Sequence, residues 1–315
     1  MVPNVNATPV LGRRGLYWRS GVCLVLLLGA GWLLRRHWPV VAHGAVRLAG
    51  ADQEWLLVAA VAAVGTWASS ALAQQGAVTR RLPGGRLVAA QFAASAANHV
   101  LPAGLGAGAV NLRFLMRCGI TAGRGASALA VKAASGAVVR LALIAVLAPA
   151  CPGLLRVPHV SGAAILAVTA AAALGVVLLR ARVWPRCRDA VAAVAADIRA
   201  LHARPARAAA LWGGSLAFAG LHALVLFAVT RAVGLPLPPA RVALLYLAAS
   251  GAAALLPTPG GLGSLDAALA FALTASGTPA AAAASAVLGY RLLTMWLPLL
   301  PGLLVLGLLV RRRAL

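Results

Sequence analysis

The segment LLPTPGGLGSLDAAL, residues 255–269, interrupts an apolar stretch and places a carboxylate beside the interruption. Proline removes a backbone donor and glycine permits conformations that other residues resist, so a continuous helix is not expected here. Asp266 is the only acid inside an apolar run. Hydrocarbon tolerates irregular backbone only where it is buried in protein or faces a water-filled cavity. The segment therefore predicts a sheltered polar site within a membrane protein.

The composition places the whole chain in the membrane. Of its 315 residues, 62% are hydrophobic and 10% are charged, whereas soluble domains contain about 45–50% apolar and about 25% charged residues. We predict an all-α polytopic protein with about seven to nine membrane segments: a flexible N-terminus at 1–16 and one integral domain at 17–313. The expected spans lie at 17–34, 55–73, 125–147, 160–179, 208–233 and 279–296, with a short apolar run at 298–310 and interrupted stretches at 87–117 and 242–276.

The formal net charge of +23 arises from 28 basic and 5 acidic residues. Most arginines lie at the ends of apolar runs, which is typical of span orientation and attraction to anionic lipid rather than of nucleic-acid binding. We therefore expect a multi-pass protein of the cytoplasmic membrane, with its N-terminus in the cytoplasm. The connection at 180–207 carries seven arginines and apolar residues at helical spacing, which indicates either a cytoplasmic helix on the membrane surface or a solvated linker helix.

Catalytic and metal-binding motifs are missing from the sequence. It contains no GxSxG, HExxH or Walker A motif and no paired carboxylates. The four cysteines are scattered singly, without a CxxC pair that would indicate zinc. The Arg13-Arg14 pair followed by an apolar run resembles a twin-arginine signal peptide. No convincing cleavage site follows it, so an uncleaved first helix is expected. We predict a protein that is not an enzyme and uses no cofactor or metal.

The interrupted segment has a counterpart earlier in the chain. LPAGLGAGAV begins at residue 101 and LPTPGGLGSL at residue 256, and each leads into an apolar helix that ends at Gly119 or Gly277. A single cation, Lys132 or Arg291, follows in the next helix. These features predict repeat units at 87–148 and 242–310, each holding a broken or re-entrant hairpin in an inverted repeat. Paired interruptions of this kind mark a midplane transport site; the alternative is a kinked helix used only for packing.

Ionisable side chains inside predicted spans are the candidate ligands of this site, because such residues are costly in lipid and usually mark pathways or pairs. Arg291 and Lys132 suit an anionic headgroup, and Asp266 pairs with one of them or balances charge. The predicted substrate-binding residues are Arg291, Lys132, Arg113, Arg117, Asp266, Tyr290, Asn98, Gly104, Gly106, Pro257, Pro259, Gly260, Gly261 and Gly263. A helix restarting at Gly106 or Gly263 would also direct free N–H groups towards an anion such as phosphate.

The stretches LPTPGGLGSLDAALAFALTASG and GYRLLTMWLPLLPG resemble the lysylphosphatidylglycerol synthase transmembrane region, the flippase-like membrane domain also found at the N-terminus of the multiple peptide resistance factor. The family pattern is a Pro-x-Pro-Gly-Gly-Leu-Gly run, an acid, a glycine and a Tyr-Arg pair. In this chain it corresponds to 257–263, Asp266, Gly277 and Tyr290-Arg291, and NHVLPAGLGAGAVNLRFLMRCGI is similar to the family's first-half region. The family usually has glutamate at the position of Asp266.

The first half departs further from the family pattern. The family tends to carry an acid after the first glycine run and acids near the cation of the next helix, whereas this chain has 107–109 AGA and 131–133 VKA. Bifunctional members carry a soluble aminoacyl-transferase domain after the membrane domain, and this sequence ends at RRRAL. The resemblance therefore implies only the lipid-handling half, without synthase activity.

Two functions remain open from the sequence. The first is a flippase-like protein that binds or translocates an anionic or headgroup-bearing lipid, with a phospholipid or other polar lipid as its partner. The second is a non-transporting accessory subunit that anchors a lipid-modifying synthase or glycosyltransferase. A membrane-embedded lipid-modifying enzyme is disfavoured because acid/base pairs are missing. A homo-oligomer is compatible with either function.

Overall fold

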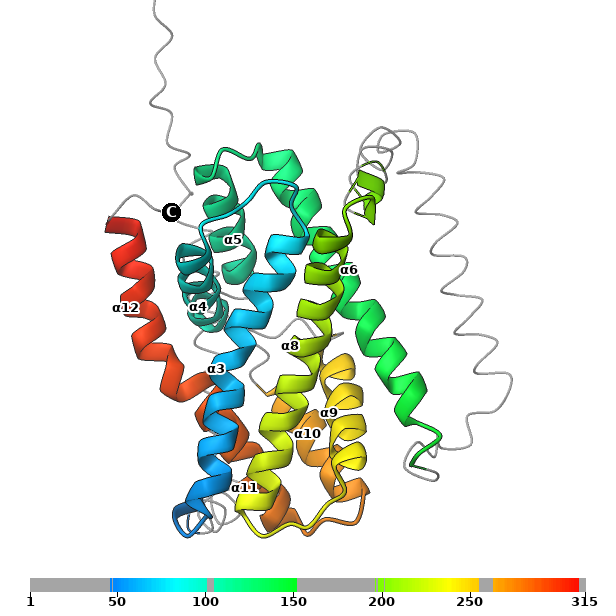
Figure 1. The fold of residues 1–315 in the computed structure, drawn as a ribbon. Helices are drawn as coiled ribbons and strands as arrows, with labels where there is room; N and C mark the ends of the chain where they lie inside the picture. Colours follow the sequence, from blue (N-terminus) through cyan, green and yellow to red (C-terminus); the bar gives the residue numbers. More distant parts are fainter. Residues whose placement is uncertain are drawn as a thin grey trace, which may run out of the picture.

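The computed structural model describes residues 46, 48–100, 105–151, 196, 198–200, 202–254 and 263–311, and every regular element within these residues is helical (Figure 1). This confirms the predicted all-α class. The predicted N-terminus, the expected spans at 17–34 and 160–179, and most of the connection at 180–207 lie outside the described residues.

Two long antiparallel helices, α3 (Gln53–Gly76) and α8 (Pro205–Ala232), run side by side through the molecule (Figure 1). Small residues allow their backbones to approach closely. A Cβ atom at Gly76 would lie 2.2 Å from the backbone nitrogen of Leu211, and one at Gly214 would lie 2.4 Å from that of Ala73. Larger side chains at these two glycines would therefore force the pair apart.

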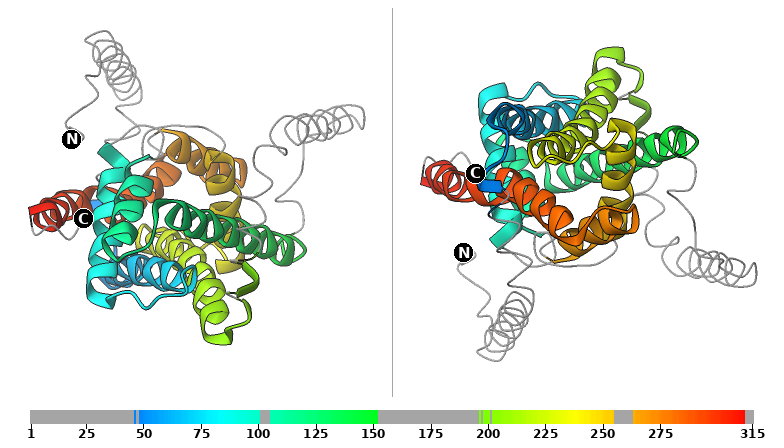
Figure 2. Two further views of the ribbon diagram at one scale, coloured as in Figure 1. Left: turned by 90° about the horizontal axis from the view of Figure 1, so that it is seen from above. Right: turned by 90° about the horizontal axis from the view of Figure 1, so that it is seen from below.

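Within the described part of the chain, four helical stretches are long and apolar enough to cross a membrane: α3, α8, α6 (Ala122–Leu147) and the composite Ala280–Arg311. The composite consists of α11 (Ala280–Arg291), a π-helical turn η3 (Leu292–Trp296) and α12 (Leu297–Arg311). Viewed from above and below, α6 and α12 reach outwards on opposite sides of the bundle (Figure 2).

The composite helix corrects the expectation of separate runs at 279–296 and 298–310, because the helical path continues through both. Pro298 lies at the start of α12 directly after η3, and Pro301 lies inside α12. α12 packs against the first hairpin: a Cβ atom at Gly302 would lie 2.7 Å from Cβ of Ala96.

The two interrupted stretches form short helical pairs, α4 (Gly84–Val100) with α5 (Leu105–Arg117) and α9 (Pro239–Ala254) with α10 (Ser264–Ala275). α4 and α5 lie in the half of the molecule that holds the C-terminal end of α3, whereas α9 and α10 lie in the opposite half (Figure 1). Each pair is packed together. The two hairpins thus have the opposed placement that an inverted repeat requires.

Each hairpin is followed by a glycine in the left-handed region that other residues rarely adopt. Gly119, after α5, has φ of 81°, and Gly277, after α10, has φ of 93°. Each hairpin also has its own apolar core. Phe114 and Leu115 are buried in one cluster around α4 and α5, while Leu269 and Leu273 are buried in another with α8, α9 and α11.

Positive charge in the described residues is concentrated at one end of the bundle, where α3 and α5 end and α4, α6 and α8 begin. This basic end carries Arg80, Arg81, Arg86, Arg113, Arg117, Arg124, Arg204 and Arg207. The opposite end, where α3 begins and α8 ends, carries Asp52, Glu54, Arg231 and Arg241. A cavity of about 460 Å³ at the basic end is lined by Arg80 and Arg124, among others.

Candidate functional site

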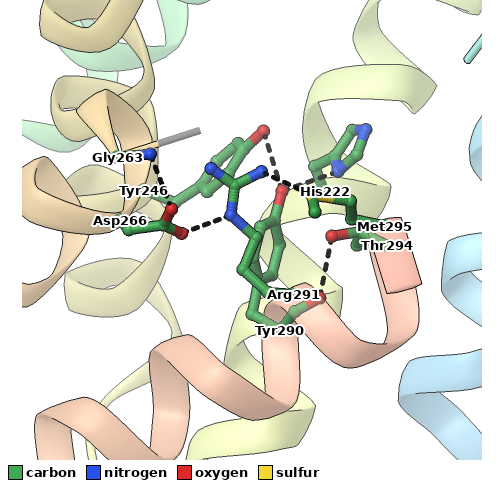
Figure 3. A network of polar contacts seen from close by, with 8 residues as sticks. All are labelled: His222, Tyr246, Gly263, Asp266, Tyr290, Arg291, Thr294 and Met295. Atoms are coloured by element: carbon green, nitrogen blue, oxygen red, sulfur yellow. Dashed lines mark hydrogen bonds and ion pairs between the residues drawn. The ribbon is translucent and has the colours of Figure 1, made fainter. Parts of the chain in front are cut away.

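Arg291 and Asp266 form a salt bridge between the last residue of α11 and the first turn of α10 (Figure 3). The Arg291 Nε donates to Asp266 Oδ1. Arg291 is 6% exposed, while the Asp266 side chain is 32% exposed. Of the two cations that the sequence offered as partners for Asp266, Lys132 and Arg291, the structure selects Arg291. Arg291 is turned to the protein interior rather than to the acyl chains.

Asp266 also caps the helix that restarts after the second interruption. Its Oδ2 accepts a hydrogen bond from the backbone nitrogen of Gly263 at 2.9 Å, and Gly263 has φ of 81°. This corrects one expectation, because the Gly263 N–H donates to Asp266 instead of pointing free towards an anion. Gly106 likewise has a packing role: a Cβ atom there would lie 2.1 Å from the carbonyl oxygen of Ala97, so glycine is needed to close the α4–α5 hairpin.

Tyr290 lies in a buried aromatic cluster next to the salt bridge (Figure 3). Its hydroxyl lies 2.9 Å from Nδ1 of His222 and donates to the Tyr246 hydroxyl at 3.4 Å. Tyr290 is only 2% exposed, and the rings of His222 and Tyr246 are stacked with centroids 5.9 Å apart. Tyr290, one of the predicted substrate-binding residues, joins α8, α9 and α11 through these contacts.

A cavity of about 540 Å³ lies between the two hairpins, lined by α3, α5, α6, α8 and α9. Ala107 and Gly108 contribute from the first turn of α5, just after the first interruption, and Ala254 contributes from the last residue of α9, just before the second. One helix end from each interruption, the start of α5 and the end of α9, thus borders this cavity. This is the kind of shelter that irregular backbone in a membrane requires.

Lys132 and Arg140 line this cavity from the same helix, α6, separated by ~12 Å of helix rise. The Lys132 ammonium donates to Ser70 Oγ at 2.9 Å, Gln74 Oε1 at 3.1 Å and Gln91 Oε1 at 2.9 Å. All three acceptors are neutral. The Arg140 Nε is buried without a hydrogen-bond partner among the described residues.

Polar residues of the first hairpin hold the Lys132 acceptors in place. The Gln91 Nε2 donates to Asn111 Oδ1 at 2.6 Å, and the Asn111 Nδ2 donates to the Ala107 carbonyl at 2.9 Å. This leaves the Gln91 carbonyl oxygen facing Lys132. The network ties the first turn of α5 to α4 and α6.

No carboxylate belongs to the described lining of the cavity. A buried charge is expensive unless it is paired, and neutral hydrogen bonds satisfy the donors of Lys132 without cancelling its charge. Two cations, with no counter-charge in the described lining, give the cavity a positive potential. An anion that entered would be attracted to it, and an additional cation would be repelled.

The aromatic cluster connects this cavity to the salt bridge. Phe218 of α8 lines the cavity, and its ring packs edge-on against His222 with centroids 4.6 Å apart. His222 in turn contacts Tyr290, the neighbour of Arg291. The predicted cations Lys132 and Arg291 therefore do not share one pocket, but a continuous row of packed side chains joins their surroundings.

Three further predicted residues, Arg113, Arg117 and Asn98, do not belong to the described lining of the cavity. Arg113 and Arg117 are exposed on α5, because the buried face of that helix carries Asn111, Phe114 and Leu115. Asn98 is half-buried near the end of α4. The other predicted positions, Gly104, Pro257, Pro259, Gly260 and Gly261, fall outside the described residues.

Sequence reasoning left out five residues of the site: Ser70, Gln74, Gln91, Asn111 and Arg140. The sequence shows each of them only as a polar or cationic side chain within an apolar helix. Such side chains commonly form ordinary hydrogen bonds between helices, so they do not by themselves indicate a site. Ser70 and Gln74 are one turn apart on α3 and face the same ammonium. Only the packing of α3, α4 and α6 shows that these groups converge.

Comparison with known families agrees with this architecture. The profile of the family described as "Lysylphosphatidylglycerol synthase TM region" matches residues 21–302. No curated protein matches the chain significantly. The match covers both hairpins, the cavity and the Arg291–Asp266 pair. The chain therefore belongs to the lysylphosphatidylglycerol synthase transmembrane region family.

Proposed function

We propose that the protein binds a phospholipid or other polar lipid with an anionic headgroup and moves that headgroup across the membrane through the cavity between the two hairpins. The observation that carries this proposal is the pair of cations, Lys132 and Arg140, in a hollow bordered by both interruptions and lined by no described carboxylate. The volume of about 540 Å³ falls within the range of about 300–1,000 Å³ that is typical of small-molecule sites.

The proposed transport needs the two hairpins to open towards opposite sides of the membrane in turn. The headgroup phosphate would accept hydrogen bonds from the Arg140 guanidinium and would be attracted by the charge of Lys132, whose own donors are held by Ser70, Gln74 and Gln91, while the acyl chains stay in lipid. The Arg291–Asp266 pair keeps its own charges balanced, so it does not compete for the phosphate. The sequence holds no Walker A motif, and we propose passive or ion-coupled movement without covalent chemistry.

We also propose that the basic end of the bundle faces the cytoplasm. Arginine and lysine are enriched in cytoplasmic loops, and eight arginines lie at this end. α3 begins at the opposite end, which agrees with a cytoplasmic N-terminus followed by one preceding span. The membrane would be the cytoplasmic membrane.

One observation favours a second candidate function. The exposed arginines of the basic end offer a positively charged surface to a soluble partner. A lipid-modifying synthase or glycosyltransferase could be anchored there, and the protein would then present a lipid to the enzyme without transporting it.

Reconstitution into liposomes separates these functions. The wild-type protein should expose a fluorescent phosphatidylglycerol analogue of the inner leaflet to an external quencher. Lys132→Gln and Arg140→Gln should slow this exchange at least tenfold, whereas Arg86→Gln, which removes an exposed cation from the first turn of α4, should leave it unchanged. Liposomes whose inner leaflet stays protected with wild-type protein would refute transport and favour the anchoring function.

Thiol labelling tests whether the cavity is wet. Ala133 lines the cavity on α6, while Val138, on the same helix, lies outside the described lining and is 52% exposed. Ala133→Cys should react with a charged, water-soluble thiol reagent, and Val138→Cys should react slowly because it faces acyl chains. Equal protection of both thiols would show a dry interior and contradict the proposed pathway.

A further inference from the structure

We propose that the cavity at the basic end of the bundle binds the phosphate group of a phosphate monoester. This cavity of about 460 Å³ lies where α3 ends and α6 begins, and it is lined by residues 77–80, residues 119–121, one face of α6 and Ala200. The described linings of this cavity and of the cavity between the hairpins share no residue. The site is therefore separate from the proposed lipid pathway.

Two arginines bring positive charge to this cavity. Arg80 follows the end of α3, and Arg124 lies in the first turn of α6. A Cβ atom at Gly119 would lie 2.7 Å from Nη1 of Arg80, so this guanidinium rests against the turn between α5 and α6. Within the described part of the chain, neither arginine forms a salt bridge, and no carboxylate lines the cavity. A cleft lined by charges of one sign concentrates ions of the opposite sign, so the pair favours an anionic ligand.

Neutral donors lie in the same lining. Thr79, Thr121 and Ser127 each offer a hydroxyl. Thr121 is also the N-cap residue of α6, and its side chain does not cap the helix. The first N–H groups of α6 are thus left without a side-chain acceptor, and such groups bind phosphate with the help of the helix dipole. Guanidinium, hydroxyl and backbone donors together match the several oxygens of a phosphate group.

The charge of the ligand follows from the two arginines. A phosphate monoester carries about −1.5 to −2 charges near pH 7, because its second pKa is about 6, whereas a diester carries a single charge. The monoester thus supplies about one negative charge for each guanidinium. The lining also contains apolar side chains, of which Val78, Ala128 and Val131 are buried, and these offer a surface to a nonpolar group attached to the phosphate. A soluble molecule and a monoester lipid headgroup share this chemistry.

Isothermal titration of the purified, detergent-solubilised protein with phenyl phosphate and phenyl sulfate tests the proposal. The two probes have similar shapes, but at a pH of about 7.5 phenyl phosphate carries about two negative charges and phenyl sulfate carries a single one. The wild-type protein should bind phenyl phosphate more tightly by about fivefold or more, which corresponds to about 1 kcal/mol. At a pH of about 5 the phosphate monoester takes up a proton, so this preference should disappear.

Variants show whether the two arginines form the site. Arg80→Gln and Arg124→Gln, which replace exposed side chains, should each weaken the binding of phenyl phosphate by about fivefold or more. Arg86→Gln is the matched control, because it removes the same charge from an exposed position at the basic end outside this lining, and it should leave the affinity unchanged. Equal losses in all three variants would overturn the site and indicate diffuse attraction to the basic surface. Equal affinity of the wild-type protein for the two probes would overturn the preference for a monoester.

Competition identifies the source of the phosphate. Phosphatidic acid carries a monoester headgroup, and phosphatidylglycerol carries a diester. If phosphatidic acid in the micelles displaces phenyl phosphate and phosphatidylglycerol does not, the ligand is a lipid with a monoester headgroup. If neither lipid displaces the probe, the ligand is a soluble phosphate monoester. Equal displacement by both lipids would contradict the charge count and overturn the proposal.

Discussion

Replacing Asp266 by asparagine should reveal how strongly the buried guanidinium of Arg291 depends on its partner. Asparagine keeps the size of the side chain and an oxygen that can accept from the Gly263 N–H, so the helix cap of α10 is largely retained. The substitution removes the charge alone. Arg291, 6% exposed, then loses the ionic interaction with Asp266.

The expected loss follows from the geometry. Two unit charges about 4 Å apart interact by about 4 kcal/mol at an effective dielectric constant of about 20. The Asp266 side chain is 32% exposed, so solvent screens part of this energy, and roughly half of it remains. Removing one partner of a more fully buried pair costs about 3–5 kcal/mol. We expect Asp266→Asn to lower the free energy of unfolding by about 2–4 kcal/mol.

Asp52→Asn is the matched control. Asp52 caps α3 by accepting from the Glu54 N–H at 2.9 Å, and it is exposed. Asparagine caps helices about as well as aspartate, so this change should cost less than about 0.5 kcal/mol. Both variants keep a helix cap, and only the Asp266 variant loses a buried cation's partner.

Unfolding in mixed micelles with increasing dodecyl sulfate, followed by circular dichroism, measures the loss of unfolding free energy in Asp266→Asn and in Asp52→Asn. Arg291→Met and the double variant complete a mutant cycle, and its coupling energy should reach about 1–3 kcal/mol. A coupling energy near zero, or an Asp266→Asn effect no larger than that of Asp52→Asn, would refute the assignment of this pair as a stabilising element.

Two further predictions use the same assay. Gly106→Ala should destabilise the protein by about 1–3 kcal/mol because its Cβ would meet the Ala97 carbonyl oxygen, while Gly108→Ala, with no heavy atom within 4 Å of its Cβ, should be neutral or slightly stabilising; equal effects would exclude the proposed closure of the hairpin. Tyr290→Phe should cost about 1–2 kcal/mol by leaving His222 without its hydroxyl partner, and an unchanged midpoint would show that this hydrogen bond is not formed.

The fold class and the positions of the interruptions could be predicted because they depend on local chemistry. A content of hydrophobic and charged residues far from that of soluble domains indicates a membrane protein. Consecutive prolines and glycines interrupt a helix wherever they occur. The short helices α4, α5, α9 and α10 follow from these rules. The pairing of Asp266 with one of two cations was also foreseeable, since a lone intramembrane acid needs a partner.

The make-up of the cavity could not be predicted, because it depends on the rotation of each helix about its axis. Arg113 and Lys132 are both cations close to the first interruption, yet Arg113 is exposed and Lys132 is held among polar side chains from α3 and α4. The spacing of apolar residues along α5 does not by itself show which face of this helix packs against α6. Arg140 was not among the predicted residues for a similar reason, because the sequence does not show that its side chain lines the cavity.

The continuous path of α11, η3 and α12 has a mechanical consequence. On one side of η3 this helix holds Arg291, which forms a salt bridge with Asp266 of the second hairpin, and on the other side it packs against the first hairpin through Gly302 and Ala96. π-helical turns are rare, and they occur often at functional sites. We therefore expect η3 to act as a hinge that couples the two hairpins. Opening of one hairpin would then shift the other, so the pathway would not be open to both sides of the membrane at once.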